Sequence, residues 1–482
     1  KRQPYGRGLL GALLFFGLPS IQSSEKDRMR DLILSGGPWS KQQKDQIMSY
    51  CESDVIALSS LFGRMNESLD WPRALLRGRY MKSVALIQNN GTPIDGVTYS
   101  QLLEDWDTMQ DQLIAEIDQD FDVYEGRSFR SVKFEVYLQK HGIVWPRLSS
   151  GALDLQDKTF REMAKTYPQL QALHELRYSL SQLRLSSLVV GSDHRNRCLI
   201  SPFGSKTGRN QPSTSKFIFG PATWFRGLIK PEPGYGLAYI DYSQQEFGIA
   251  AALSGDKNMQ EAYLSGDPYL SFAKQAGAVP TEATKHTHAA AREQFKACVL
   301  AVQYGMGEAS LALRINQPIA RARQLLAMHR TTYPIFWRWS DSAVDQAALS
   351  GKLWSVFGWP IHVDVDFNSR SIRNFPMQAN GAEMLRLACI YITEAGIRVC
   401  APVHDALLIE APLELLEGYV QKAQALMAQA SRDVLDGFEL RSDVKVVKFP
   451  DRYMDDRGVT MWDTVMQLSA NLRVSTMGTS GS

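Results

Sequence analysis

The chain has 482 residues, of which 44% are hydrophobic, and its formal net charge at pH 7 is +2. This length and composition predict several packed units with real cores, and the near-neutral bulk charge by itself predicts no polyanionic partner. The five cysteines are scattered and form no CxxC pair, which argues against a disulfide framework or a zinc knuckle and favours a cytoplasmic location.

The first 66 residues predict helices. The opening run KRQPYGRGLLGALLFFGLPS has the basic start and apolar middle of a signal peptide. Glycines interrupt it, however, and it continues into the charged segment EKDRMRDLIL. We therefore interpret it as a buried helix of a domain whose beginning is missing. No other run is long and apolar enough to span a membrane, so we expect no membrane partner.

Residues 67 to about 190 predict amphipathic helices, because apolar positions recur every three or four residues. From about residue 191 onward, strand-like and helical segments alternate. Between His194 and Pro231 there is no acidic residue, yet the segment contains several basic ones: Arg195, Arg197, Lys206, Arg209, Lys216, Arg226 and Lys230. Such a run is either a solvated face or a surface that follows phosphates.

In GYGLAYIDYSQQEFGIAAAL, the apolar LAYI predicts a short strand with Asp241 at its end, followed by a helix. Asp241 could cap that helix. Alternatively, it could pair with a second carboxylate to bind Mg²⁺, which prefers oxygen ligands and often takes some of them from phosphates.

Two later segments repeat candidate binding residues at a spacing of four, which places them on one face of a helix. The first carries Arg292, Lys296, Leu300 and Tyr304. Its cations suit a triphosphate and its ring could stack on a base, although a solvated basic turn leading into a core helix is the alternative. The second carries Arg370, Asn374 and Gln378, which suit minor-groove acceptors or, equally, a capped surface helix.

Near the end of the chain, IRVCAP and VHDALLIEAP predict two short strands joined by a tight turn that carries Asp405. Asp is a common turn residue. It is also the candidate partner of Asp241, because two carboxylates can bridge two Mg²⁺ ions that activate a hydroxyl and stabilise a leaving pyrophosphate.

Together these segments resemble the family A DNA polymerases. DYSQQE resembles motif A, the RxxxKxxxLxxxYG pattern resembles motif B and VHD resembles motif C, in the family's order. RSIRNFPMQ resembles the segment between motifs B and C, and TGRNQPS resembles the segment that contacts the primer. The resemblance covers about residues 70 to 465 and implies an α+β, right-hand fold, with an antiparallel palm sheet and helical fingers and thumb. It places the thumb at 67–190, palm and fingers at 191–482, and the fingers at about 250–360.

The resemblance also implies roles for individual residues. Asp241 and Asp405, with the Tyr242 carbonyl, would bind two Mg²⁺ ions, for which Mn²⁺ could substitute. Lys296 would act in catalysis, and Glu246 would exclude a ribose 2′-OH. The remaining nucleotide-binding residues would be Gln244, Tyr269, Arg292, Lys296, Leu300 and Tyr304. The DNA-binding residues would be Arg209, Arg226, Arg370, Asn374, Gln378 and His404. The implied partners are primer-template DNA and a dNTP, and we expect a monomer.

Three positions depart from the family pattern. Ala406 stands where an acid commonly follows the HD pair, so metal binding is expected to depend on two aspartates. Leu300 replaces an aromatic residue in motif B, which puts handling of dideoxynucleotides in doubt. Tyr269 aligns roughly with a phosphate-binding His and brings no positive charge.

The N-terminal segment contains Tyr50 and Asp54 in a YxxxD arrangement. This resembles the last motif of the DEDD-type 3′–5′ exonuclease that precedes such thumbs. The acids of the earlier motifs would lie upstream of Lys1, so residues 1–66 are expected to be an exonuclease remnant that does not proofread.

The function that these observations favour is template-directed DNA polymerisation, in replication or repair. A single-subunit RNA polymerase is a rival, against which Glu246 argues. A polymerase-fold protein that only binds nucleic acid, with weak or no catalysis, is another, against which Asp241, Asp405, Arg292 and Lys296 argue.

Overall fold

A computed structural model describes residues 8–19, 23–182, 188–220, 222–363 and 368–479. The chain divides into two compact units, 1–78 and 79–482, and the division falls within helix α4 (Trp71–Asn90). The predicted boundary after residue 66 precedes that helix. Each unit is described here by itself.

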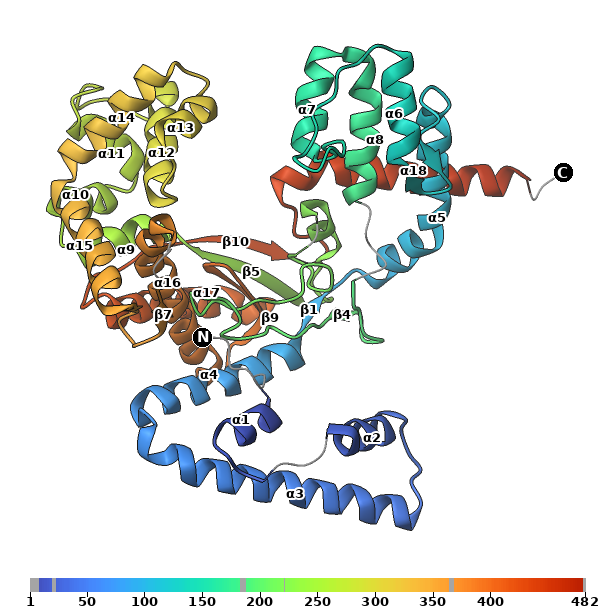
Figure 1. Ribbon diagram of the computed structural model, residues 1–482, viewed down its shortest axis with the longest axis vertical. Coiled ribbons are helices and arrows are strands. Elements are labelled where there is room, and N and C mark those ends of the chain that lie inside the picture. Colours follow the sequence, from blue (N-terminus) through green and yellow to red (C-terminus); the bar gives the residue numbers. More distant parts are fainter. Residues whose placement is uncertain (1–7, 20–22, 183–187, 221, 364–367, 480–482) are drawn as a thin grey trace. The chain divides into compact units, whose positions relative to one another are not determined.

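The first unit is helical, as the sequence predicts (Figure 1). It consists of α1 (Leu9–Phe15), α2 (Ser23–Leu34), α3 (Lys41–Met65), the 3₁₀ turn η1 (Asn66–Ser68) and the start of α4. Ser40 and Gln43 form a capping box that starts α3. The prediction of a buried first helix holds for one face only: Leu13 is buried, whereas Phe15 is 52% exposed. The reason is that the small core beneath α1 contacts a single side of it.

The second unit is built around a four-stranded antiparallel sheet with the strand order β10-β5-β9-β8 (Figure 1). The strands are β5 (Tyr235–Tyr242), β8 (Arg398–Val403), β9 (Ala406–Pro412) and β10 (Ser442–Lys448). Two long helices, α16 (Ser369–Glu394) and α17 (Leu413–Val434), pack together and against this sheet. The two strands predicted within residues 397–412 are therefore confirmed as the β8–β9 hairpin, and β5 lies between β9 and β10.

A run of helices follows β5 directly and continues to the start of β6 (Figure 1). They are α9 (Gln245–Ser254), α10 (Lys257–Leu264), α11 (Pro268–Gln275), α12 (Ala289–Gln303), α13 (Glu308–Ile315), α14 (Ile319–Thr332) and α15 (Pro334–Ser350). Asp256 and Asp267 cap α10 and α11 with their side chains. A small hairpin, β6 (Lys352–Trp354) and β7 (Pro360–His362), connects this run to α16.

The segment after α4 forms a second group of helices with an aromatic core that includes Phe134, Trp145 and Phe160. They are α5 (Gly96–Asp118), α6 (Ser131–Lys140), α7 (Asp157–Thr166), η2 (Pro168–Leu170) and α8 (Gln171–Gln182). Two short pairs of strands accompany them: β1 (Thr92–Pro93) with β4 (Arg195–Asn196), and β2 (Tyr124–Glu125) with β3 (Ser128–Phe129). The last helix, α18 (Val459–Thr479), packs against α5.

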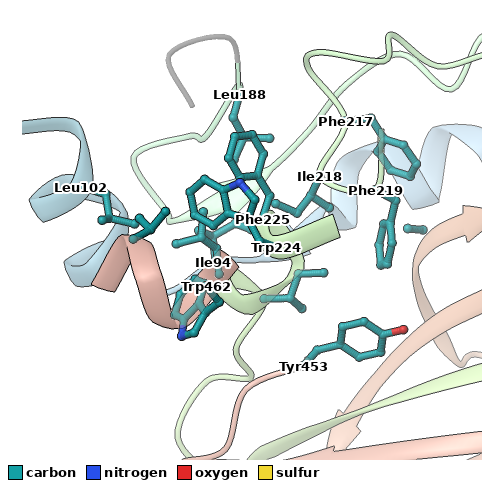
Figure 2. Close-up of a cluster of buried hydrophobic side chains, with 14 of the residues drawn as sticks. Ile94, Leu102, Leu188, Phe217, Ile218, Phe219, Trp224, Phe225, Tyr453 and Trp462 are labelled. Atoms are coloured by element: carbon teal, nitrogen blue, oxygen red, sulfur yellow. The ribbon is translucent and has the colours of Figure 1, made fainter. Parts of the chain in front are cut away.

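A large hydrophobic cluster connects these helices to the sheet (Figure 2). Its centre is Trp224 on η4 (Thr223–Leu228), whose ring contacts Phe225, Trp106 and Trp462. Trp462 lies on α18, which the short turn η5 (Asp456–Gly458) precedes. Segments more than 200 residues apart in the sequence therefore share one core.

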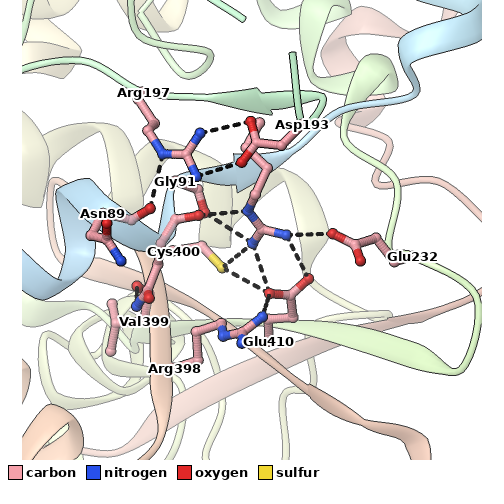
Figure 3. A network of polar contacts seen from close by, with 11 residues as sticks. Asn89, Gly91, Asp193, Arg197, Glu232, Arg398, Val399, Cys400 and Glu410 are labelled. Atoms are coloured by element: carbon pink, nitrogen blue, oxygen red, sulfur yellow. Dashed lines mark hydrogen bonds and ion pairs between the residues drawn. The ribbon is translucent and has the colours of Figure 1, made fainter. Parts of the chain in front are cut away.

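The basic run of residues 194–231 is largely neutralised by acids. Arg195 pairs with Glu232 and Glu410, and Arg197 pairs with Asp193 (Figure 3). Further ion pairs are Arg209 with Glu246, Arg226 with Asp455, and Lys230 with Asp95. Much of the run therefore stabilises the fold, so it is not as a whole a free surface for phosphates.

Candidate active site

The two aspartates that the sequence singled out lie side by side on the central sheet. Asp241 is the penultimate residue of β5, and Asp405 lies in the turn between β8 and β9. The register pairs Asp241 with Ala406, and the Tyr242 N–H donates to the Asp405 carbonyl at 3.3 Å. Helix α9 has Gln244 at its N-cap position, so capping by Asp241 is excluded.

Two non-glycine residues near this pair, His404 just before Asp405 and Gln244 three residues after Asp241, adopt left-handed backbone conformations. His404 has φ 55° and Gln244 has φ 47°. Such conformations cost free energy and concentrate at functional sites. They turn the chain after β8 and after β5, and the pairing of both strands with β9 places these two turns at the same end of the sheet.

Burial is the largest of the effects that raise the pKa of Asp241 to about 7, and the nearby carboxylates of Asp405 and Asp443 contribute to the same shift. Burial also raises the pKa of Asp405, although a backbone hydrogen bond and Arg209 oppose this effect. The sequence reasoning missed Asp443. It lies opposite Asp241 on β10, where the Ser243 hydroxyl donates to it at 2.7 Å.

These residues fit a divalent cation. The Oδ1 atom of Asp241 is buried and has no hydrogen-bond partner among the described residues, and a positive ion would satisfy it. In the described ranges no three or more His, Cys, Asp or Glu side chains gather so as to hold a metal by themselves. An ion held by this pair would therefore complete its shell with oxygens from water or from a bound ligand.

A cavity of about 350 Å³ opens beside Asp405. Its lining includes most of the predicted nucleotide-binding residues, namely Gln244, Glu246, Tyr269, Leu300 and Tyr304. Two of the predicted DNA-binding residues, Arg209 and His404, line it as well. Sequence reasoning missed Gln303 in this lining. Gln303 is buried, and its Nε2 atom has no partner among the described residues. Its place one residue before Tyr304 is the only signal in the sequence.

The two predicted cations, Arg292 and Lys296, lie on α12, before the residues of that helix that line the cavity. Arg292 pairs with Asp267 at 2.5 Å and with Glu293 at 2.8 Å, while Lys296 lies 3.6 Å from Glu293. The Arg292 guanidinium also lies 5.5 Å from the ring centre of Tyr269. Acidic side chains of the protein therefore neutralise both cations in this structure.

Tyr304 ends α12 and is 44% exposed at the cavity. The next residue, Gly305, has φ +63°, and a Cβ there would lie 2.8 Å from the Arg370 side chain. Only glycine fits this position without strain. Arg370, Asn374 and Gln378 all lie on α16, and the Oδ1 atom of Asn374 is buried without a partner among the described residues.

Glu246 lies in the first turn of α9, 3.3 Å from the Arg209 guanidinium. Burial raises the pKa of Glu246, and Arg209 opposes that shift. Arg226, another predicted DNA-binding residue, has a side chain that is 12% exposed and pairs with Asp455. In the first unit, burial and a hydrogen bond with Asp54 raise the pKa of Tyr50, so these two residues meet on α3.

The structure thus combines an antiparallel sheet, two carboxylates at its strand ends and a cation-bearing helix between those strands in the sequence, as the predicted right-hand polymerase fold requires. Residues 214–447 match the family described as DNA polymerase family A. This match bears out the predicted resemblance to the family over these residues, and the solved structure described below bears out the α+β fold class.

Several known proteins are similar to this chain. DNA polymerase I of Chloroflexus aurantiacus is 24% identical over 435 residues, which are 81% of this chain and 45% of the relative. The thermostable DNA polymerase I of Thermus aquaticus is 28% identical over 210 residues, which are 41% of this chain and 25% of the relative. The chain therefore spans less than half of the length of these relatives.

A solved structure, the POL domain of Pol1 from M. smegmatis in complex with DNA primer-template and dNTP, has a TM-score of 0.71 to this chain. The alignment has 19% sequence identity and covers 93% of this chain and 79% of that one, so it establishes the shared fold. In the ranges that the structure describes, no helix combines the length and apolar character needed to cross a membrane.

Proposed function

We propose that this chain is a template-directed DNA polymerase that adds deoxynucleotides to the 3′ end of a primer. The observation that carries the proposal is the pair Asp241 and Asp405. Burial raises the pKa of both carboxyls, and repulsion by Asp405 adds to the shift at Asp241. The Oδ1 atom of Asp241 is left without a partner among the described residues, and Asp405 lines an open cavity. Such a pair is stable in its charged form only with cations bound.

The side chains of Asp241 and Asp405, with the Tyr242 carbonyl, would hold two Mg²⁺ ions, or Mn²⁺ in their place. When bound, such ions supply a more acidic primer hydroxyl and neutralise the charge that develops on the leaving pyrophosphate. The Ser243–Asp443 hydrogen bond fixes a third carboxylate nearby, which favours cation binding without requiring Ala406 to be acidic.

The other residues would bind and orient the substrates. Arg292 and Lys296 would leave their ion pairs with Asp267 and Glu293 and bind the β- and γ-phosphates instead. Lys296 would also aid catalysis. Tyr269 would donate a hydrogen bond to the phosphates, while Gln244, Leu300 and Tyr304 would contact the nucleotide. His404 would orient the primer end.

The DNA would lie against α16 and the segment that carries Arg209. The partnerless oxygen of Asn374 supports a contact with a donor in the minor groove, with Arg370 and Gln378 one helical turn to either side. Arg226 would contact DNA only after release from Asp455. We assign the thumb to about 67–190, the fingers to about 250–360 and the palm to the rest of 191–482. Residues 1–66, with Tyr50 and Asp54 in contact, would be an exonuclease remnant.

Primer extension on a labelled primer-template with Mg²⁺ tests the proposal. We expect extension with dNTPs and little with NTPs, in a monomeric and cytoplasmic enzyme. Extension with NTPs would favour an RNA polymerase, and DNA binding without extension would favour a binding protein. Asp405→Asn should lose extension, which excludes a contaminating polymerase as its source. The matched control is Asp451→Asn at an exposed position, which should extend primers as the parent does.

A further inference from the structure

The segment that carries Arg209 is a tight turn. The Gly208 N–H donates to the Ser205 carbonyl at 3.0 Å, and the Arg209 N–H donates to the Ser205 hydroxyl at 2.9 Å. Gly208 has φ +74°, and a Cβ at this position would lie 3.1 Å from the ring of Trp359. The turn therefore lies directly against that indole.

Trp359 holds the turn from the loop between β6 and β7. Its Nε1–H donates to the Lys206 carbonyl at 3.0 Å, and its ring stacks on Phe203 with 5.6 Å between the ring centres. Its own N–H donates to the hydroxyl of Ser355 at 2.8 Å, and that hydroxyl donates to Glu383 at 2.9 Å. The backbone of Trp359 is thus itself fixed by a chain of hydrogen bonds that ends on α16.

Arg386 holds the same turn from α16. It is buried and forms an ion pair with Glu383 at 2.7 Å, and its Nη1–H donates to the Gly208 carbonyl at 2.6 Å. Two donors therefore bind the carbonyls of Lys206 and Gly208, one on each side of Thr207. The backbone that leads into Arg209 has little freedom left.

The next residue transmits this restraint to the cavity. Arg209 lies 3.3 Å from Glu246, and both side chains are largely buried. Glu246 is the group proposed above to occupy the space that a ribose 2′-OH needs. The position of its carboxylate depends on Arg209, and the position of Arg209 depends on the turn.

We propose that Trp359 and Arg386 are positioning residues that set the sugar selectivity of this site through Arg209 and Glu246. The inference rests on the proposed polymerase function. A purely structural role for these residues would lower stability and reduce activity equally with both sugars. A positioning role changes the ratio of kcat/KM for dCTP to that for CTP.

The first test is Trp359→Phe, which removes the Nε1–H donor and keeps an aromatic ring against Gly208 and Phe203. Since one neutral hydrogen bond is lost, we expect the dCTP/CTP ratio to fall about fivefold. The matched control is Trp354→Phe on the same hairpin, where the side chain is 45% exposed, and we expect no change there. Arg386→Lys retains the buried charge beside Glu383 but loses the planar fork of donors, and it should shift the ratio in the same direction.

The second test is a double-mutant cycle with Glu246→Ala. In that background Trp359→Phe should not lower the ratio further, because its effect passes through the carboxylate that has been removed. An additional, independent fall would overturn the route through Glu246. An unchanged ratio in both Trp359→Phe and Arg386→Lys would overturn the proposal itself.

Hydrogen exchange on the free chain separates this inference from the proposed function. The amides of residues 205–209 should exchange faster in Trp359→Phe than in the parent and in Trp354→Phe. Unchanged exchange would show that the indole does not restrain the turn, whatever the activity. If the parent fails to extend primers, the proposed function and the effect on sugar selectivity both fail, and exchange still decides whether the turn is held.

Discussion

Glu410 on β9 offers a quantitative test of how the sheet that carries Asp405 is held. Glu410 is 2% exposed, and its carboxylate accepts hydrogen bonds from Arg195 at 2.7 and 3.3 Å and from Arg398 at 3.0 Å (Figure 3). Arg195 also pairs with Glu232 at 2.7 Å, but the Glu232 side chain is 54% exposed. One guanidinium therefore has a buried and an exposed carboxylate partner.

Glu410→Gln keeps the shape of the side chain and removes its charge, so the buried guanidinium of Arg195 loses its principal partner. Breaking a buried ion pair in this manner lowers the free energy of unfolding by about 3–5 kcal/mol. Glu232→Gln removes an exposed partner of the same arginine and should cost less than about 1 kcal/mol. For a unit of roughly 400 residues, the unfolding entropy is roughly 0.8 kcal/mol/K. We therefore expect Tm to fall by about 5 °C in Glu410→Gln and by about 1 °C or less in Glu232→Gln.

Thermal unfolding followed by calorimetry at neutral pH measures both shifts on the full chain. The decisive quantity is the difference between the two variants, because they share Arg195 and the same chemical change. Equal Tm values within a degree would refute the argument that burial determines the strength of this ion pair.

Three further predictions concern catalysis and acid stability. Asp241→Asn should lower the single-turnover extension rate on the order of a thousandfold or more while primer-template binding persists, and a near-parental rate would contradict its assignment. Leu300→Tyr should increase incorporation of dideoxynucleotides relative to the parent, because a tyrosine hydroxyl can stand in for the missing 3′-OH; chain-termination assays that give equal patterns for both proteins would count against it. Burial lowers the pKa of His329 to about 3, so its contribution to stability is present above about pH 6.5 and is lost as the pH falls toward 3. That loss amounts to about 4 kcal/mol by pH 3. His329→Gln, which keeps an acceptor for the Trp337 indole, should show a shallower decline of Tm between pH 6.5 and 4, and a decline as steep as that of the parent would exclude His329 as its source.

The sequence alone determined the local frame of the candidate site. An apolar run ending in Asp241 and a second ending at the turn of Asp405 predict strands with carboxylates at their ends, and β5 and the β8–β9 hairpin confirm those strands. Spacing by four residues predicted that Arg292 and Lys296 share a helix face, and α12 contains both. These inferences succeed because strand and helix periodicity is a property of neighbouring residues.

Only the tertiary structure decided which distant groups meet. Asp443 lies opposite Asp241 because β10 pairs with β5. The local sequence SDVKVVK does not predict which strand it pairs with. The basic run looked like a single surface, yet Arg195 and Arg226 are committed to Glu410 and Asp455. The sequence does not show which acid a given arginine pairs with. Burial and proximity are set by the packing of segments that lie hundreds of residues apart. The chain therefore specifies the chemistry of its site locally, and its packing fixes the charges and the restraints around it.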